Sequence, residues 1–161
     1  MAVAERSPNP SAGAAEGVLA ITRLFDAPRA AVFAAFVDPR HARRWMGPST
    51  HPATDAEADV RPGGSWRVCL RAIEGGPELW QGGVFREIVP GERLVYTFSW
   101  DQDDGTQGPE TLVTITFADQ GGKTLMSFRQ AVFATVSNCD GHRIGWTSAF
   151  DRLDDWLHRR N

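Results

Sequence analysis

The spacing of hydrophobic residues changes along the chain, from a helical period near its start to a strand period in its middle. The segment VLAITRLF at residues 18–25 predicts a strand. It is followed by RAAVFAAFVD at residues 29–38, whose apolar residues fall on one stripe of a helix. A second short helix is predicted in RHARRWMG at residues 40–47, with Trp45 and Met46 on its apolar side. The chain is therefore expected to begin with one strand and two short helices.

Both predicted helices carry start signals. Asp26 stands two residues before Pro28, and Asp38 directly precedes Pro39. An aspartate can accept the first free backbone N–H groups of a helix, and a proline in the first turn loses no hydrogen bond. The pair Gly47–Pro48 predicts the end of the second helix.

From residue 55 onward the period becomes two, which is typical of strands. In RLVYTFSW, for example, Tyr96 and Phe98 share one face and Thr97 points to the other. Short turn segments such as DQGG at residues 119–122 predict hairpins between the runs. The predicted strands lie at residues 55–60 (the weakest), 63–71, 79–89, 93–100, 110–118 and 123–133. With the first strand they make an antiparallel meander of six or seven strands.

The last predicted element is a long helix, CDGHRIGWTSAFDRLDDWLHRR at residues 139–160, capped by Asn138 or Asp140. A curved antiparallel sheet packed around this helix is the simplest arrangement, which makes an α+β fold. The buried face of the helix is predicted to consist of Gly145, Trp146, Ala149, Leu153 and either Trp156 or Leu157.

Two glycines, Gly141 and Gly145, lie near the start of this helix. Each glycine in a helix interior costs roughly 1 kcal/mol relative to alanine. Their presence predicts that the helix start either approaches the sheet closely or leaves volume for a cavity.

The composition indicates one globular domain. The chain has 161 residues, of which 42% are hydrophobic, and a net charge of −3. This charge is too small to favour nucleic-acid binding, and no apolar run approaches the roughly 20 residues of a membrane span. Residues 1–17 are rich in Ala, Gly, Pro and Ser and predict a disordered tail, which leaves residues 18–161 for the domain.

The N-terminus lacks the basic start and apolar stretch of a signal peptide. The two cysteines, Cys69 and Cys139, share no motif and are predicted to be buried free thiols. Together these features favour a cytoplasmic location.

Five segments occur in an order that resembles a known family: FDAPRAAVFAAFVDPRHARRWMGP, RPGGSWRVCLR, GVFREIVPGERLVYTFSW, ETLVTITFADQGGKTLMSFRQ and GHRIGWTSAFDRLDDWL. They resemble the bacterial branch of the activator of 90-kDa heat-shock protein ATPase family, within the START-like (SRPBCC) superfamily. The resemblance covers residues 18–160. It implies a helix-grip fold like that of the Bet v allergens. Such a fold has a strongly curved antiparallel sheet, two short helices after strand 1, and a long C-terminal helix over a hydrophobic cavity.

The cavity implied by this resemblance directs attention to the aromatic residues. A tryptophan is most often a core residue, but Trp45, Trp66 and Trp146 are placed where helices and sheet are expected to meet. The candidate cavity-lining residues are Trp45, Met46, Trp66, Val68, Tyr96, Phe98, Met126, Gln130, His142, Gly145 and Trp146.

Two polar candidates lie among them. His142 shares a helix face with Gly145 and Trp146, so it either bonds a ligand, acts as a general base, or is a satisfied structural residue. Gln130 is expected to place an amide at the cavity mouth.

No metal or cofactor site is predicted. Cys139 with His142 makes only half of a zinc site. The acidic segment DQDDGTQGPE lacks the glycine and glutamate positions of a calcium loop, and no glycine-rich turn has phosphate-loop spacing.

Three function classes remain open. A binding module for a small hydrophobic or amphipathic molecule is favoured, because no base–nucleophile pair can be named. The alternative is a cyclase, dehydratase or hydrolase acting on a hydrophobic metabolite, since START-like relatives include such enzymes. The resemblance also implies a heat-shock protein ATPase as a partner in the stress response. A homodimer is a further alternative for the assembly.

Overall fold

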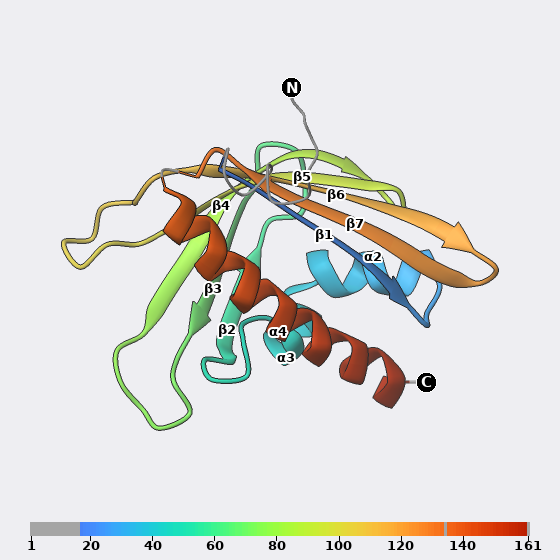
Figure 1. Cartoon of the computed structure of the whole chain (residues 1–161), viewed down its shortest axis with the longest axis horizontal. Helices are drawn as coiled ribbons and strands as arrows, with labels where there is room; N and C mark the ends of the chain where they lie inside the picture. The colour runs from blue at the N-terminus through green and yellow to red at the C-terminus, as the bar shows by residue number, and fades with distance from the viewer. Residues whose placement is uncertain (1–16, 134, 161) are drawn as a thin grey trace.

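The computed structural model describes residues 17–133 and 135–160 and arranges them as one sheet with three helices (Figure 1). The elements in chain order are β1 (Val18–Phe25), α2 (Arg29–Val37), α3 (Pro39–Trp45), β2 (Ala53–Ala58), β3 (Ser65–Leu70), β4 (Leu79–Val89), β5 (Arg93–Trp100), β6 (Thr111–Gln120), β7 (Lys123–Ala131) and α4 (Val136–Arg160). Residues 1–16 of the predicted tail lie outside the described residues. Gly17, the last residue of that predicted tail, is buried, and its carbonyl accepts a hydrogen bond from the Phe133 N–H at 3.1 Å.

The seven strands form a single antiparallel sheet in the order β1-β7-β6-β5-β4-β3-β2. Strands β2 to β7 follow one another as a meander, as the sequence predicts. Strand β1 then pairs with the last strand, and Val18 lies opposite Ala131. The curved sheet, the two short helices after strand 1 and the long C-terminal helix confirm the predicted helix-grip architecture. Figure 1 shows α4 running across one face of the sheet, with α2 and α3 beside its C-terminal half.

An aromatic cluster closes the end of the molecule where α2 and α3 lie. Phe150 of α4 packs against Phe25, Phe36 and Phe128, with ring centroids 6.4, 6.2 and 5.3 Å away. Trp45 of α3 joins the cluster, and its indole N–H donates to the Ala35 carbonyl at 2.8 Å. This half of the space between sheet and helix is therefore filled by side chains.

The start signals of the helices are partly as predicted. Asp38 accepts the Arg40 backbone N–H at 2.9 Å and caps α3. The prediction that Asp26 caps the preceding helix is wrong, because α2 begins after Pro28 and has no side-chain cap. The predicted caps of the last helix are also wrong. That helix begins at Val136, and the hydroxyl of Thr135 accepts the Asn138 N–H at 3.0 Å.

Candidate ligand-binding cavity

A cavity of about 220 Å³ lies between the first half of α4, strands β3 to β5 and the segment that follows α3. It adjoins the aromatic cluster, because its wall residue Trp146 stacks on Phe150 with ring centroids 5.5 Å apart. Its lining is mostly apolar and consists of Met46, Gly47, Pro48, His51, Leu70, Leu79, Gln81, Phe98, Trp100, Gly141, His142, Gly145, Trp146 and Ala149. Among these described residues there is no Asp, Glu, Lys or Arg.

The two glycines of α4 border this cavity. A Cβ atom added at Gly141 or at Gly145 would meet no atom within 4 Å outside its own helix neighbourhood. By contrast, a Cβ at Gly83 would collide with the carbonyl oxygen of Thr97. The expectation that glycines bring the helix start close to the sheet is therefore wrong, and the alternative, that they leave volume for a cavity, agrees with the structure.

Three aromatic side chains form the inner wall. Phe98 and Trp100 project from β5, and Trp146 projects from α4. The Phe98 ring lies 5.7 Å from that of Trp100 and 6.0 Å from that of Trp146, both in edge-to-face geometry. Such contacts fix ring orientations, so the wall is rigid and apolar.

A hydrogen-bond network behind this wall defines the state of His142. The indole N–H of Trp100 donates to His142 Nε2 at 3.2 Å, and His142 Nδ1 lies 3.2 Å from Gln130 Oε1. The same Gln130 oxygen accepts the Trp146 indole N–H at 2.9 Å, and the Gln130 amide nitrogen donates to the Thr111 hydroxyl at 2.8 Å. The network ends where that hydroxyl donates to the Phe98 carbonyl at 3.0 Å.

The network determines which nitrogen of His142 carries the proton. An indole N–H can only donate, so Trp100 requires an unprotonated Nε2 and Trp146 requires an oxygen of Gln130. The proton of His142 therefore sits on Nδ1 and points to that oxygen. Burial lowers the pKa of the imidazole from 6.5 to about 4, in agreement with a neutral ring. Both nitrogens are engaged, so the ring faces the cavity without a free polar atom.

Gln81 of β4 is the polar side chain of the lining that lacks a protein partner. It is 3% exposed. Within residues 17–133 and 135–160 its amide makes no side-chain hydrogen bond, while it lines the cavity. The sequence reasoning did not single it out.

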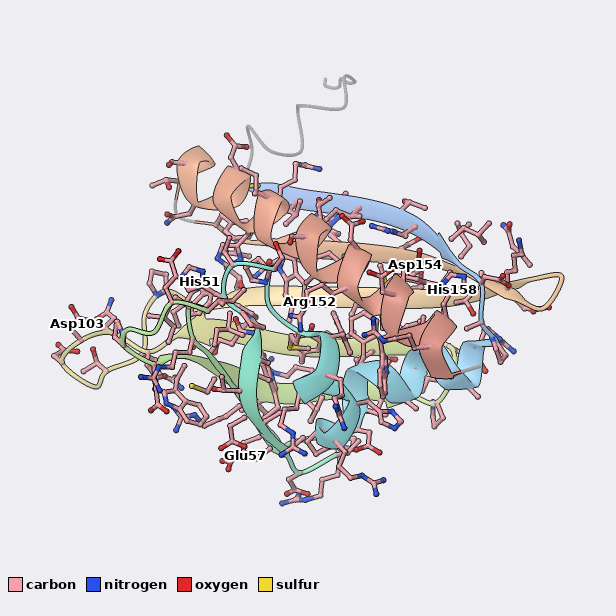
Figure 2. All side chains as sticks on the ribbon, turned by 90° about the horizontal axis from the view of Figure 1, so that it is seen from below. His51, Glu57, Asp103, Arg152, Asp154 and His158 are labelled. Atoms are coloured by element: carbon pink, nitrogen blue, oxygen red, sulfur yellow. The ribbon has the colours of Figure 1, made fainter. Side chains whose placement is uncertain are left out.

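The wall opposite the sheet is held by Arg152 of α4. Its guanidinium donates to the carbonyls of Met46 and Gly47 at 2.8 and 2.9 Å and to that of Arg44 at 3.2 Å. The Ser148 hydroxyl accepts the Ser49 N–H at 3.0 Å on the same segment. Figure 2 shows the Arg152 side chain reaching from α4 toward the segment that joins α3 to β2. These bonds fix residues 46–49 as a cavity wall.

The structure brings together part of the predicted set. Met46, Phe98, His142, Gly145 and Trp146 line the cavity, as the sequence reasoning proposed.

Three of the predicted residues lie at a separate hollow. Trp66, Val68 and Tyr96 line a hollow of about 20 Å³, which has room for a single water molecule. Burial raises the pKa of the Tyr96 phenol far above its ordinary value. This hollow is too small for an organic ligand.

The last three predicted residues do not line either space. Trp45 and Met126 are completely buried in the core, where Trp45 belongs to the aromatic cluster. Gln130 is completely buried behind the aromatic wall rather than at a cavity mouth, because its amide bonds His142, Trp146 and Thr111.

Several lining residues were missed by sequence reasoning, although a signal for some of them exists. Trp100 shares a strand face with Phe98, and Gln81 lies opposite Trp100 on the neighbouring strand. The period-two pattern of the sequence shows that Trp100 and Phe98 share a face. The position of Gln81 opposite Trp100 can be known only from the register of the two strands. The other missed residues are Gly47, Pro48, His51, Leu70, Leu79 and Ala149.

A second hollow of about 200 Å³ shares Phe98, Trp100 and His142 with the cavity. Its remaining described lining comes from Pro109, Thr111, Phe133 and Asn138. The bonded pair of Trp100 and His142 therefore stands between two spaces.

Neither a metal cluster nor a membrane helix is found in the described part of the chain. No group of three or more His, Cys, Asp or Glu side chains is placed there to hold a metal ion. None of the helices described combines the length and apolar content needed to cross a membrane. Cys69 and Cys139 are free and buried, as predicted.

Comparisons with solved structures show the same fold in several bacterial proteins. The crystal structure of a protein from Chromobacterium violaceum is 26% identical, with a TM-score of 0.80, and the match covers 88% of this chain and 96% of that chain. A solution structure from Arthrobacter aurescens is 22% identical, with a TM-score of 0.81, over 91% of this chain and 88% of that chain. The AHSA1 protein from Silicibacter pomeroyi is 22% identical, with a TM-score of 0.80, over 89% and 99%.

The sequence itself matches a family model. No curated protein matches the chain. The family model described as Activator of Hsp90 ATPase homolog 1-like protein matches residues 26–158, which include α2, α3, strands β2 to β7 and all of α4 except its last two residues. The chain therefore belongs to the activator of Hsp90 ATPase homolog 1-like family of START-like, helix-grip proteins.

Proposed function

We propose that the protein binds a small, mostly apolar molecule in the cavity between the sheet and the first half of α4. The observation that carries this proposal is a cavity of about 220 Å³ with an apolar lining, bordered by Gly141 and Gly145. Pockets of small-molecule binding proteins are typically concave, apolar and supplied with few polar groups. Two helix glycines that cost stability and contact nothing are consistent with volume that is kept for a ligand.

Binding is favoured over catalysis by the state of His142. A general base needs a nitrogen within reach of the substrate proton. Both ring nitrogens of His142 are engaged with Trp100 and Gln130. Cys139 is completely buried and does not line the cavity, so it cannot serve as a nucleophile there. The enzyme alternative would therefore require the aromatic wall to rearrange.

We further propose a protein partner and a cellular location, each of which can be tested separately from ligand binding. The family name suggests a heat-shock ATPase as a partner, which a pull-down with the cell's own Hsp90 would test. A homodimer would be detected by light scattering. The free thiols of Cys69 and Cys139 support a reducing compartment such as the cytoplasm.

The binding proposal is tested with an uncharged fluorescent probe, N-phenyl-1-naphthylamine, whose emission rises in apolar surroundings. The variant Gly145→Leu places a side chain in the cavity and should weaken probe binding by about tenfold or more, because a Leu-sized contact area contributes roughly 1.5–3 kcal/mol. The matched control is Thr147→Leu, which adds the same side chain to the exposed face of α4. Equal probe binding by the parent and both variants would refute the proposal.

Native mass spectrometry of freshly purified protein adds an independent observation. A co-purified small molecule that is lost in Gly145→Leu and retained in Thr147→Leu would identify the ligand directly.

A further inference from the structure

We propose that Gln81 hydrogen-bonds an uncharged polar group of the ligand, so that the cavity selects apolar molecules carrying one neutral donor or acceptor. This inference rests on the binding function proposed above and adds the chemical class of the ligand. It starts from one observation, an amide that faces the cavity without a partner among the described side chains.

The environment of Gln81 is unusual for a polar residue of the core. The side chain is 3% exposed, and no hydrogen bond joins its amide to a side chain within the described residues. The described atoms that are both fully buried and unpaired do not include its amide, which therefore keeps access to the cavity that it lines. The other buried glutamine, Gln130, is completely enclosed, and its amide bonds three neighbours, as most buried polar groups do.

The neighbours of Gln81 in the sheet cannot satisfy its amide. It lies between Val68 of β3 and Trp100 of β5 on the inner face of the sheet. Val68 has no polar side-chain atom, and the single N–H of the Trp100 indole is already donated to His142. Along β4 the same face continues with Leu79 and Gly83, which also offer no polar side chain. The cavity is the remaining direction in which the amide can find a partner.

The other polar side chains of the described lining already have hydrogen-bond partners in the protein. Both nitrogens of His142 are engaged behind the aromatic wall. His51, on the segment between α3 and β2, has its Nδ1 3.0 Å from the Thr50 hydroxyl. The amide of Gln81 is therefore the polar group of the described lining that faces the cavity and is free to donate and to accept.

The residues of the described lining determine whether the ligand group that Gln81 bonds can be charged. An ion brought into an apolar cavity loses its hydration and needs an opposite charge nearby. The described lining contains no Asp, Glu, Lys or Arg, and His142 is neutral. A primary amide pairs equally well with a hydroxyl, a carbonyl or another amide. The geometry therefore fits an apolar molecule with one such neutral group and disfavours a carboxylate or an amine.

The test uses three probes on one aromatic scaffold: naphthalene, 2-naphthol and 2-naphthoate, each titrated at pH 7 by equilibrium dialysis. The measured quantity is the ratio of the dissociation constant of naphthalene to that of 2-naphthol. Replacing the amide in Gln81→Leu should lower this ratio about five- to tenfold, which corresponds to one hydrogen bond of roughly 1 kcal/mol. Naphthalene itself should bind Gln81→Leu at least as well as the parent, and 2-naphthoate should bind the parent most weakly.

Two further variants keep the test decisive. Gln81→Met preserves side-chain length without the amide, and it gives the same ratio change if Gln81→Leu does not fold. Gln120→Leu is the matched control, because it makes the same substitution at an exposed glutamine of β6 that does not line the cavity, and it should leave the ratio unchanged.

The outcomes separate this inference from the binding function. If naphthalene and 2-naphthol bind the parent but the ratio is the same in Gln81→Leu and Gln81→Met, the role of Gln81 is overturned while the binding function stands. A ratio that changes equally in Gln120→Leu also overturns it. Tighter binding of 2-naphthoate than of 2-naphthol overturns the neutral class. If none of the three probes binds the parent, the binding function and this inference fall together.

Discussion

Replacing Gly145 by alanine should make the protein more stable, although it changes a residue that borders the proposed binding cavity. A Cβ atom at this position would meet no atom within 4 Å, and the backbone there has an ordinary helical conformation that alanine adopts. The gain is then the difference in helix propensity, roughly 1 kcal/mol in the free energy of unfolding. Gly141→Ala should add a similar gain, because its Cβ also meets nothing.

The size of this effect can be measured by urea denaturation at constant m-value. In a domain of 150–250 residues, 1 kcal/mol corresponds to a rise of about 2–4 °C in Tm, so thermal melts provide a second measurement. Gly83→Ala is the matched control, because its Cβ would collide with the Thr97 carbonyl oxygen. That variant should lose about 1–3 kcal/mol through overpacking.

A Gly145→Ala variant that is no more stable than the parent would refute the reasoning. Such a result would mean that the space beside α4 is occupied, or that the helix start does not have the conformation described. If the variant is more stable but binds N-phenyl-1-naphthylamine less tightly, the stability gain and the loss of cavity volume have been separated in one experiment.

Three further predictions concern pH, the cavity wall and a helix cap. Since the pKa of His142 is 6.5 when unfolded and about 4 when folded, the unfolded chain binds more protons between these values. The free energy of unfolding should therefore fall by up to about 3 kcal/mol as pH drops from 6.5 to 4, and urea titrations of His142→Gln should lack this contribution. Arg152→Ala removes three hydrogen bonds from a charged donor and should cost about 2–3 kcal/mol, with faster amide exchange at Met46, Gly47 and Ser49. Parent-like exchange there would contradict the role of Arg152 in the wall. Asp38→Ala removes the cap of α3 and should cost about 1 kcal/mol in the same denaturation assay, and an unchanged midpoint would contradict it.

The local pattern of apolar and polar residues predicted the helices and strands well, because apolar positions mark the side chains that enter the core. The alternation around Tyr96 and Phe98 predicted a strand with these residues in the core, and both are buried there. The other face of this strand is buried as well, which the alternation did not predict. Caps were less predictable, since several polar residues near each helix start could serve. Thr135 caps the last helix and lies four residues before the predicted helix start at residue 139. Nothing in the sequence of this segment distinguishes Thr135 from Asn138 as a capping residue.

The cavity was predicted less well, because its position depends on how distant segments meet. Trp45 and Trp100 both carry the signature of a buried indole, and local spacing does not tell which one faces empty volume. The answer comes from α4, whose Phe150 fills the space beside Trp45 while Gly145 leaves the space nearer Trp100 open. Gln81 could be recognised only from its register beside Trp100.

The pairing of β1 with β7 has a consequence for how the protein is made. Strand β1 is synthesised first among the described strands, but its partner on the sheet emerges more than a hundred residues later. Until then Leu19 and Phe25, both completely buried in the finished protein, have no sheet to cover them. Strand β1 can therefore be incorporated into the sheet only after β7 has left the ribosome. A chain stalled before residue 123 would expose an apolar strand, which makes it a natural substrate for chaperones that bind during translation.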